Sequence, residues 1–131
     1  MIKPIMKSEF FLRLPSEDAG PDDAATGQDL LDTLHEHEHE CVGLAANMIG
    51  VRKRIICVKD GNRALLMYNP QILEQVNSYQ TSEGCLSLSG ERPCTRYRRI
   101  KVEYLDENFV HRIKNFSGYT AEIIQHEIDH C

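Results

Sequence analysis

The first clear pattern along the chain is a run of apolar residues at helical spacing. Leu30, Leu31 and Leu34 lie one, three and four residues apart, so they share one face of a helix. Two aspartates near the start of this stretch favour a helix N-terminus, because negative charge there complements the helix dipole. The pattern therefore predicts a helix over residues 22–40.

Farther along the chain the pattern changes to short runs rich in β-branched and aromatic residues, which is typical of strands. The runs predicted as strands are residues 54–58, 64–68, 72–79, 99–104 and 110–116. The links 60–62 and 106–108 contain residues that tolerate the left-handed backbone of tight turns. Each link should therefore join two antiparallel strands.

A second apolar helical pattern closes the sequence. Ile123, Ile124 and Ile128 predict a helix over residues 120–131. The length of 131 residues suits one domain of typical size, roughly 100 to 150 residues. We expect an α+β fold in a single domain, residues 1–131, with an N-terminal helix, mostly antiparallel strands and a C-terminal helix.

Charge and hydropathy narrow the classes of function. The chain carries 15 Lys and Arg against 20 Asp and Glu, a net charge of −5, which argues against general affinity for nucleic acid or anionic membranes. No stretch approaches the roughly 18 consecutive apolar residues that a membrane span requires. The first residues also lack the apolar stretch of a signal peptide. We expect a cytoplasmic protein.

The five cysteines are odd in number and do not have the spacing of a secreted disulfide scaffold. Most are expected to be small buried thiols, because free cysteine packs as a small apolar residue. The segment HEHEHE at 35–40 places His35 and His39 one helical turn apart, which is a possible metal-binding pair. A solvated surface is the favoured interpretation, since alternating charge is stable without a ligand.

The C-terminal helix contains the pattern HExxH. His126 and His130 lie one turn apart and can occupy two corners of a tetrahedral metal site, and Glu127 can act as a base beside them. A catalytic site of this kind needs a third protein ligand. Cys85 is a candidate, because its thiolate would bind a divalent ion and Gly84 before it permits close backbone approach. Taken alone, a surface helix and a buried thiol would explain the same residues.

Three segments, in this order along the chain, resemble the motifs of the peptide deformylase family. Residues 41–48, CVGLAANM, are similar to the first motif, GxGxAAxQ. Residues 83–87 match the second motif, EGCxS, and residues 125–130 match the third, QHExDH. The resemblance extends from about Gly43 to the last residue of the sequence.

The resemblance implies an antiparallel scaffold packed around a metal-bearing C-terminal helix. By similarity, Cys85, His126 and His130 bind Fe(II), which Zn, Ni or Co can replace. The reaction it implies is hydrolysis of the N-formyl group from N-formylmethionyl peptides of nascent bacterial chains, near the ribosome, with release of formate. Glu127 would handle the proton in this reaction.

The family pattern also assigns residues around the substrate. Negative charge on the formyl oxygen would be met by the metal, the backbone N–H of Leu86 and the glutamine of the first motif. The residues expected to contact the substrate are Gly43 and Gly84 through their backbone, Ile123 and Leu86 around the methionine side chain, Arg92 near the peptide, and the residue at position 48. Arg96 matches an arginine of the strand after the second motif.

The sequence departs from the family at the motif glutamine. Met48 stands in its place, and a thioether cannot donate a hydrogen bond. Asn47 carries an amide, but on an extended segment it would point to the opposite face. Cys41 also replaces the first glycine of that motif. His130 is followed only by Cys131, so we expect metal ligation to order the end of the helix.

Two hypotheses from different classes follow. The first is a metal-dependent deformylase, with activity reduced because Met48 replaces the glutamine. The second is a catalytically weak or inactive deformylase-like protein that binds a metal and a peptide. Glu127 favours the first, because a binding protein does not need a base beside the metal. A general HExxH zinc peptidase is disfavoured, because cysteine as third ligand is not that arrangement.

Overall fold

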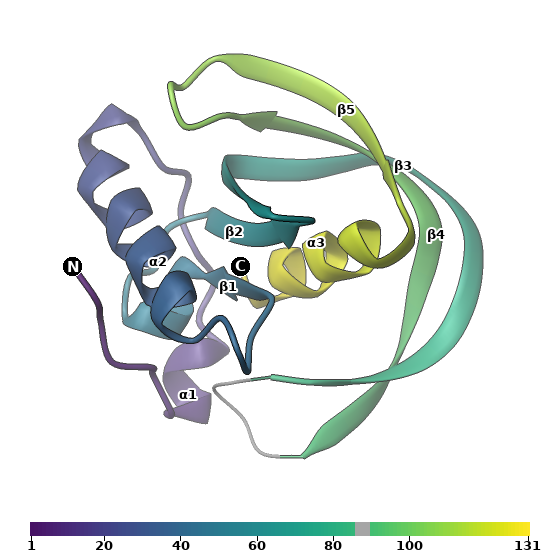
Figure 1. The fold of residues 1–131 in the computed structure, drawn as a ribbon, viewed down its shortest axis with the longest axis horizontal. Coiled ribbons are helices and arrows are strands. Elements are labelled where there is room, and N and C mark those ends of the chain that lie inside the picture. Colours follow the sequence, from purple (N-terminus) through teal and green to yellow (C-terminus); the bar gives the residue numbers. More distant parts are fainter. Residues whose placement is uncertain (86–89) are drawn as a thin grey trace.

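The computed structural model describes residues 1–85 and 90–131 (Figure 1). Its described strands form one five-stranded antiparallel sheet in which spatial order follows chain order. The strands are β1 (Gly43–Ala45), β2 (Ile55–Asp60), β3 (Arg63–Gly84), β4 (Glu91–Leu105) and β5 (His111–Ser117). Short links at 61–62 and 106–110 make antiparallel pairing the natural outcome, as predicted.

In residues 1–85 and 90–131, three α-helices and two short 3-10 segments accompany the sheet. The helices are α1 (Glu9–Leu12), α2 (Ala24–Glu36) and α3 (Gly118–His130), and the 3-10 segments are η1 (Pro21–Asp23) and η2 (Ala46–Ile49). The long strands β3 and β4 curve around α3, and α2 lies on the other side of β1 and β2 (Figure 1). The expected α+β fold, with strands around a C-terminal helix and an N-terminal helix, is confirmed.

The sheet encloses α3 because one face of β4 is apolar. Ile100, Val102 and Tyr104 alternate with more exposed residues and are almost fully buried. A period of two puts them on one face of the strand, and they share one buried core with Ala121 and Ile124 of α3, which packs against β4. The helix α3, which contains the HExxH pattern, is therefore a core element of the fold.

Strand β2 is buried on both faces. Residues 55–58 are all fully buried, so the strand lies between two layers. Cys57 faces α2, where its thiol lies 3.7 Å from the carbonyl oxygen of Leu30. At Gly27 of α2 an added Cβ would lie 2.1 Å from the hydroxyl of Tyr68, so only glycine permits this close contact between helix and sheet.

The helix α2 is shorter than the predicted helix over residues 22–40. It ends at Glu36 and residues 37–40 form turns, because no apolar residue after Leu34 anchors another helical turn to the core. His35 and His39 are therefore not a pair on one helix face, and their side chains are 82% and 95% exposed. The solvated interpretation of this segment is confirmed.

The strands are longer than the hydrophobic pattern indicated. The predicted strands 64–68 and 72–79 are parts of β3, interrupted by irregular register between Tyr68 and Gln71. Asn69, with a φ of 53°, and Pro70 cause the break in the pattern. The strand β4 begins at Glu91 and not at residue 99, because pairing with β3 holds its polar first half. Neither α1 nor β1 was predicted, and both are too short to show a period.

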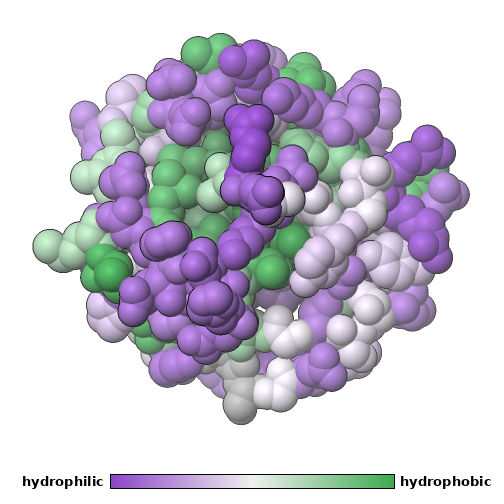
Figure 2. All heavy atoms as spheres, in the orientation of Figure 1, coloured by the Kyte–Doolittle hydropathy of each residue, from purple (hydrophilic) through white to green (hydrophobic). Residues whose placement is uncertain are grey.

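The face of the molecule shown in Figure 2 is mainly polar. On the face shown in Figure 2 most residues are hydrophilic and the apolar ones lie in separate patches. None of the helices in the described ranges is long and apolar enough to cross a membrane.

Candidate metal and catalytic site

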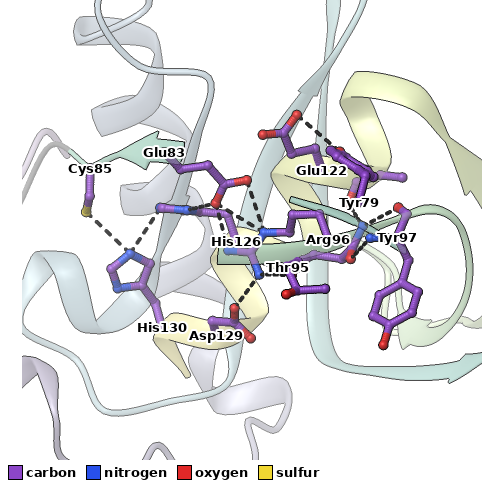
Figure 3. A network of polar contacts seen from close by, with 12 residues as sticks. Tyr79, Glu83, Cys85, Thr95, Arg96, Tyr97, Glu122, His126, Asp129 and His130 are labelled. Carbon is purple, nitrogen blue, oxygen red and sulfur yellow. Dashed lines mark hydrogen bonds and ion pairs between the residues drawn. The ribbon is translucent and has the colours of Figure 1, made fainter. Parts of the chain in front are cut away.

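Cys85 follows the last residue of β3, and it meets two histidines of α3. The distance from Cys85 Sγ to His130 Nε2 is 3.3 Å, and the Nε2 atoms of His126 and His130 are also 3.3 Å apart (Figure 3). The two histidines share one helix face because they are four residues apart. Over residues 1–85 and 90–131, this is the one group of three or more metal-ligating side chains whose ligand atoms lie within 4.8 Å of one another.

The chemistry of these donors fits a divalent transition metal. Burial, with a contribution from His126, lowers the pKa of His130 to about 4, so its imidazole is neutral and can ligate at physiological pH. One thiolate with two imidazoles suits iron or zinc, and three protein ligands leave a position open for reactants. The residues present therefore fit the metal that the sequence motifs imply.

Glu83 orients His126 through the ring nitrogen that faces away from the other two ligands. Its Oε1 lies 2.8 Å from His126 Nδ1, so that His126 Nε2 is directed toward the other two ligands (Figure 3). Arg96 donates to both oxygens of Glu83, at 2.7 to 3.1 Å. Burial opposes ionisation of Glu83, but the hydrogen bonds from Arg96 and other neighbours outweigh it and lower its pKa to about 2. Arg96 also pairs with Asp129 at 2.7 Å, which ties β4 to the last turn of α3.

Replacing Glu83 with glutamine should weaken metal binding by about 10- to 100-fold, because the charge that polarises and orients His126 is lost. Zinc affinity measured by competition with a chelator tests this. The control is Glu74→Gln on the same strand, which removes an exposed carboxylate 3.9 Å from Lys101. Equal affinity of Glu83→Gln and wild type would contradict the role.

Glu127 lies beside the ligands in the interior. Its side chain is 3% exposed, and Oε1 has no hydrogen-bond partner among the described residues. Burial, with the charge of Glu83 adding to it, raises the pKa of Glu127 to about 8. A buried carboxyl oxygen without a partner is costly unless a ligand supplies one. The observation therefore points to a bound group at this position.

Strand β1 approaches α3 closely at this point. A Cβ added to Gly43 would lie 2.7 Å from Ile123 Cγ2 and 3.0 Å from Glu127 Oε2. Only glycine lets the backbone of β1 lie directly over the catalytic part of the helix.

A pocket of about 610 Å³ opens over these residues. It lies between β1, which is an edge strand, and the end of β3, which past Tyr68 pairs only with β4 in the described part of the sheet. Backbone groups at such edges can pair with an extended peptide. Among the lining residues are Gly43, Met48, Gly84, Cys85, Ile123, His126 and Glu127.

Comparison with known proteins agrees with this geometry. The polypeptide deformylase family model matches residues 6–131. The peptide deformylase of Clostridium beijerinckii is 52% identical over 130 residues, which cover 99% of this chain and 96% of that protein. The chain belongs to the peptide deformylase family.

Solved structures of the family have the same fold. The Met-Ala-Ser-bound class I type b peptide deformylase of Acinetobacter baumannii superimposes with a TM-score of 0.88 at 28% identity, covering 99% of this chain and 94% of that chain. The peptide deformylase of Thermus thermophilus has a TM-score of 0.88 at 33% identity, covering 99% of this chain and 81% of that chain.

The first deformylase motif forms part of the pocket wall. Met48 is 1% exposed, lines the pocket and accepts the N–H of Ala45 at its sulfur, at 3.3 Å. The segment around it is the 3-10 turn η2, so the expectation of an extended segment was wrong. Asn47 nevertheless does not line the pocket, because its amide donates to the carbonyl of His130. It is not positioned as a substitute for the motif glutamine.

One expected substrate residue, Arg92, does not line the main pocket. Arg92 lies outside the 610 Å³ pocket and lines a smaller one of about 200 Å³ behind the metal ligands. Its side chain is 60% exposed and lies 3.8 Å from a carboxylate oxygen of Glu9. Leu86, expected to provide a backbone N–H and part of the methionine pocket, lies outside the described residues.

From the sequence, no supporting role was predicted for the residues that hold the site in place. Gln125 donates to Tyr97 O at 2.9 Å and accepts from Tyr97 N at 2.8 Å, which joins α3 to β4. Both Glu83 and Gln125 belong to matched motifs, so the motifs were a signal that these two residues matter. Which partner each one meets depends on the packing of β4 against α3.

Proposed function

We propose that this chain is a metal-dependent peptide deformylase that hydrolyses the N-formyl group of N-formylmethionyl peptides and releases formate. The observation that carries the proposal is the meeting of Cys85, His126 and His130 beside the buried, unpartnered oxygen of Glu127. Membership of the family supports turnover over a purely binding role. We also propose that residues 1–131 form one domain.

Cys85, His126 and His130 would hold the metal, for which we propose Fe(II), with Zn, Ni or Co as substitutes. When bound, the metal would supply Lewis acidity that makes water nucleophilic near neutral pH. Glu127 would take a proton from the attacking water and return it to the amine as the formyl C–N bond breaks. The water oxygen leaves in formate, and the peptide keeps a free amino group.

The substrate would lie in the pocket between the two open strand edges. We propose that backbone groups of Gly43 and Gly84 pair with the peptide and that Ile123 contacts the methionine side chain. In support, all three residues line the pocket, and the related Acinetobacter structure was determined with Met-Ala-Ser bound. Arg92 would act farther along the peptide, and the backbone N–H of Leu86 would assist at the formyl oxygen.

Formate release from a formyl-Met-Ala-Ser peptide by anaerobically prepared Fe(II) protein tests the proposed function. We expect formate and free amine in equal amounts, with no cleavage of other peptide bonds. Binding of the peptide without formate release would contradict the proposal and favour a binding protein.

Replacing Cys85 with serine should weaken metal binding by at least about 10-fold, because the hydroxyl is a far poorer ligand than a thiolate. Metal content after dialysis against a chelator measures this. Cys94→Ser, which changes a nearby thiol outside the ligand group, is the control. Retention of wild-type metal content by Cys85→Ser would refute the ligand assignment.

The natural substrates would be nascent chains that carry N-formylmethionine, met near the ribosome in the cytoplasm. We propose no direct contact with nucleic acid, which the net charge of −5 disfavours. We also propose no membrane association.

A further inference from the structure

Asn47 is a buried polar residue that the proposed reaction does not use. It lies in η2, one residue before Met48, and is 1% exposed. Its Oδ1 has no hydrogen-bond partner among the described residues. Burying an amide oxygen without a hydrogen-bond partner costs free energy. The hydrogen bond made by the amide nitrogen must therefore offset that cost.

That contact is with the end of the metal-ligand helix. Asn47 Nδ2 donates to the main-chain carbonyl of His130, and a longer contact of 3.4 Å reaches the carbonyl of Leu12, the last residue of α1. Carbonyls in the last turn of a helix have no partner within the helix. Asn47 therefore supplies a buried donor at the residue whose ring is a metal ligand.

The segment η2, which contains Asn47, is itself held by backbone hydrogen bonds. Val51 N donates to Ala46 O at 3.0 Å, and Met6 N donates to Met48 O at 2.7 Å, so the residues before and after Asn47 are both hydrogen-bonded. The last turn of a helix frays unless other groups hold it. With the carbonyl of His130 bonded to η2, the His130 ring stays 3.3 Å from Cys85 Sγ and from His126 Nε2.

We propose that Asn47 is a positioning residue, which holds the backbone of His130 so that its imidazole is preorganised for the metal. This inference rests on the proposed function only through the metal ligands. Arg96, on strand β4, contacts the same turn of α3 through an ion pair of 2.7 Å with Asp129. The last turn of α3 is thus fixed from the sheet on one side and from η2 on the other.

The test uses Asn47→Leu, which keeps the number and branching of the side-chain heavy atoms and removes the donor. The rate of zinc release to a chelator should rise by about 10-fold, because the position of one ligand is no longer fixed. In the metal-free protein, amide hydrogen exchange in the last turn of α3 should increase while exchange in β2 stays unchanged. Asn47→Ser, a smaller change whose hydroxyl does not reach the carbonyl, should act in the same direction.

Ile49→Ala is the matched control, because it removes a buried side chain from the same segment and leaves the Asn47 contact in place. It should lower thermal stability without a comparable change in zinc release. Equal zinc release from Asn47→Leu, Ile49→Ala and wild type would overturn the positioning role, and so would an equal increase in both variants. If wild type released formate and bound zinc normally in these experiments, the proposed function would stand. A wild-type chain without bound zinc would overturn both.

Discussion

Replacing Glu127 with alanine is expected to lower turnover of N-formylmethionyl peptides by about 10²- to 10⁴-fold, the usual contribution of a positioned general base. The bound metal should remain, because Glu127 is not among the three grouped ligands. Formate release and metal content measured on the same preparation separate the two effects.

Stability gives a second readout for Glu127. Its carboxyl is 3% exposed and Oε1 has no partner among the described residues, so in the metal-free protein its removal loses little favourable interaction. Glu127→Gln, which keeps the shape, should unfold at the same temperature as wild type or higher, yet lack the base. Full turnover by either variant, or loss of the metal, would refute the role as base.

Replacing Met48 with glutamine is expected to raise turnover by about 10- to 10³-fold, the range for one oriented donor to a developing oxyanion. The side chain lines the pocket, and its sulfur accepts the N–H of Ala45 at 3.3 Å. A glutamine of similar length can accept that N–H through its carbonyl oxygen and present its NH₂ to the substrate. KM should change less than kcat, because the new bond forms mainly in the transition state.

Met48→Leu is the control, because it keeps an apolar side chain of similar volume and adds no donor. Both constants should be measured for the three proteins with the same metal. An unchanged rate from a fast wild type would mean that another group already donates to the oxyanion. An unchanged rate from an inactive wild type would favour the metal- and peptide-binding hypothesis.

Local periodicity explains the elements that could be predicted. The spacing of Ile123, Ile124 and Ile128 defined the last helix, and the turns at 60–62 and 106–108 defined two antiparallel hairpins. The full length of β3 and β4 could not be read in the same way. Their polar halves have no alternation of their own and are held by pairing with each other, which depends on the partner strand.

The features of the site can also be divided into those that the sequence predicts and those that depend on tertiary packing. Sequence by itself determined that His126 and His130 share a face with Glu127 beside them, because helical geometry follows from a spacing of four residues. The matched motifs identified Cys85 as their partner. Only the tertiary structure decided that Glu83 meets His126, that Gly43 lies against Glu127, and that the amide of Asn47 is bonded to His130. These contacts join residues 43 to 84 positions apart, and the curvature of the sheet around α3 brings them together.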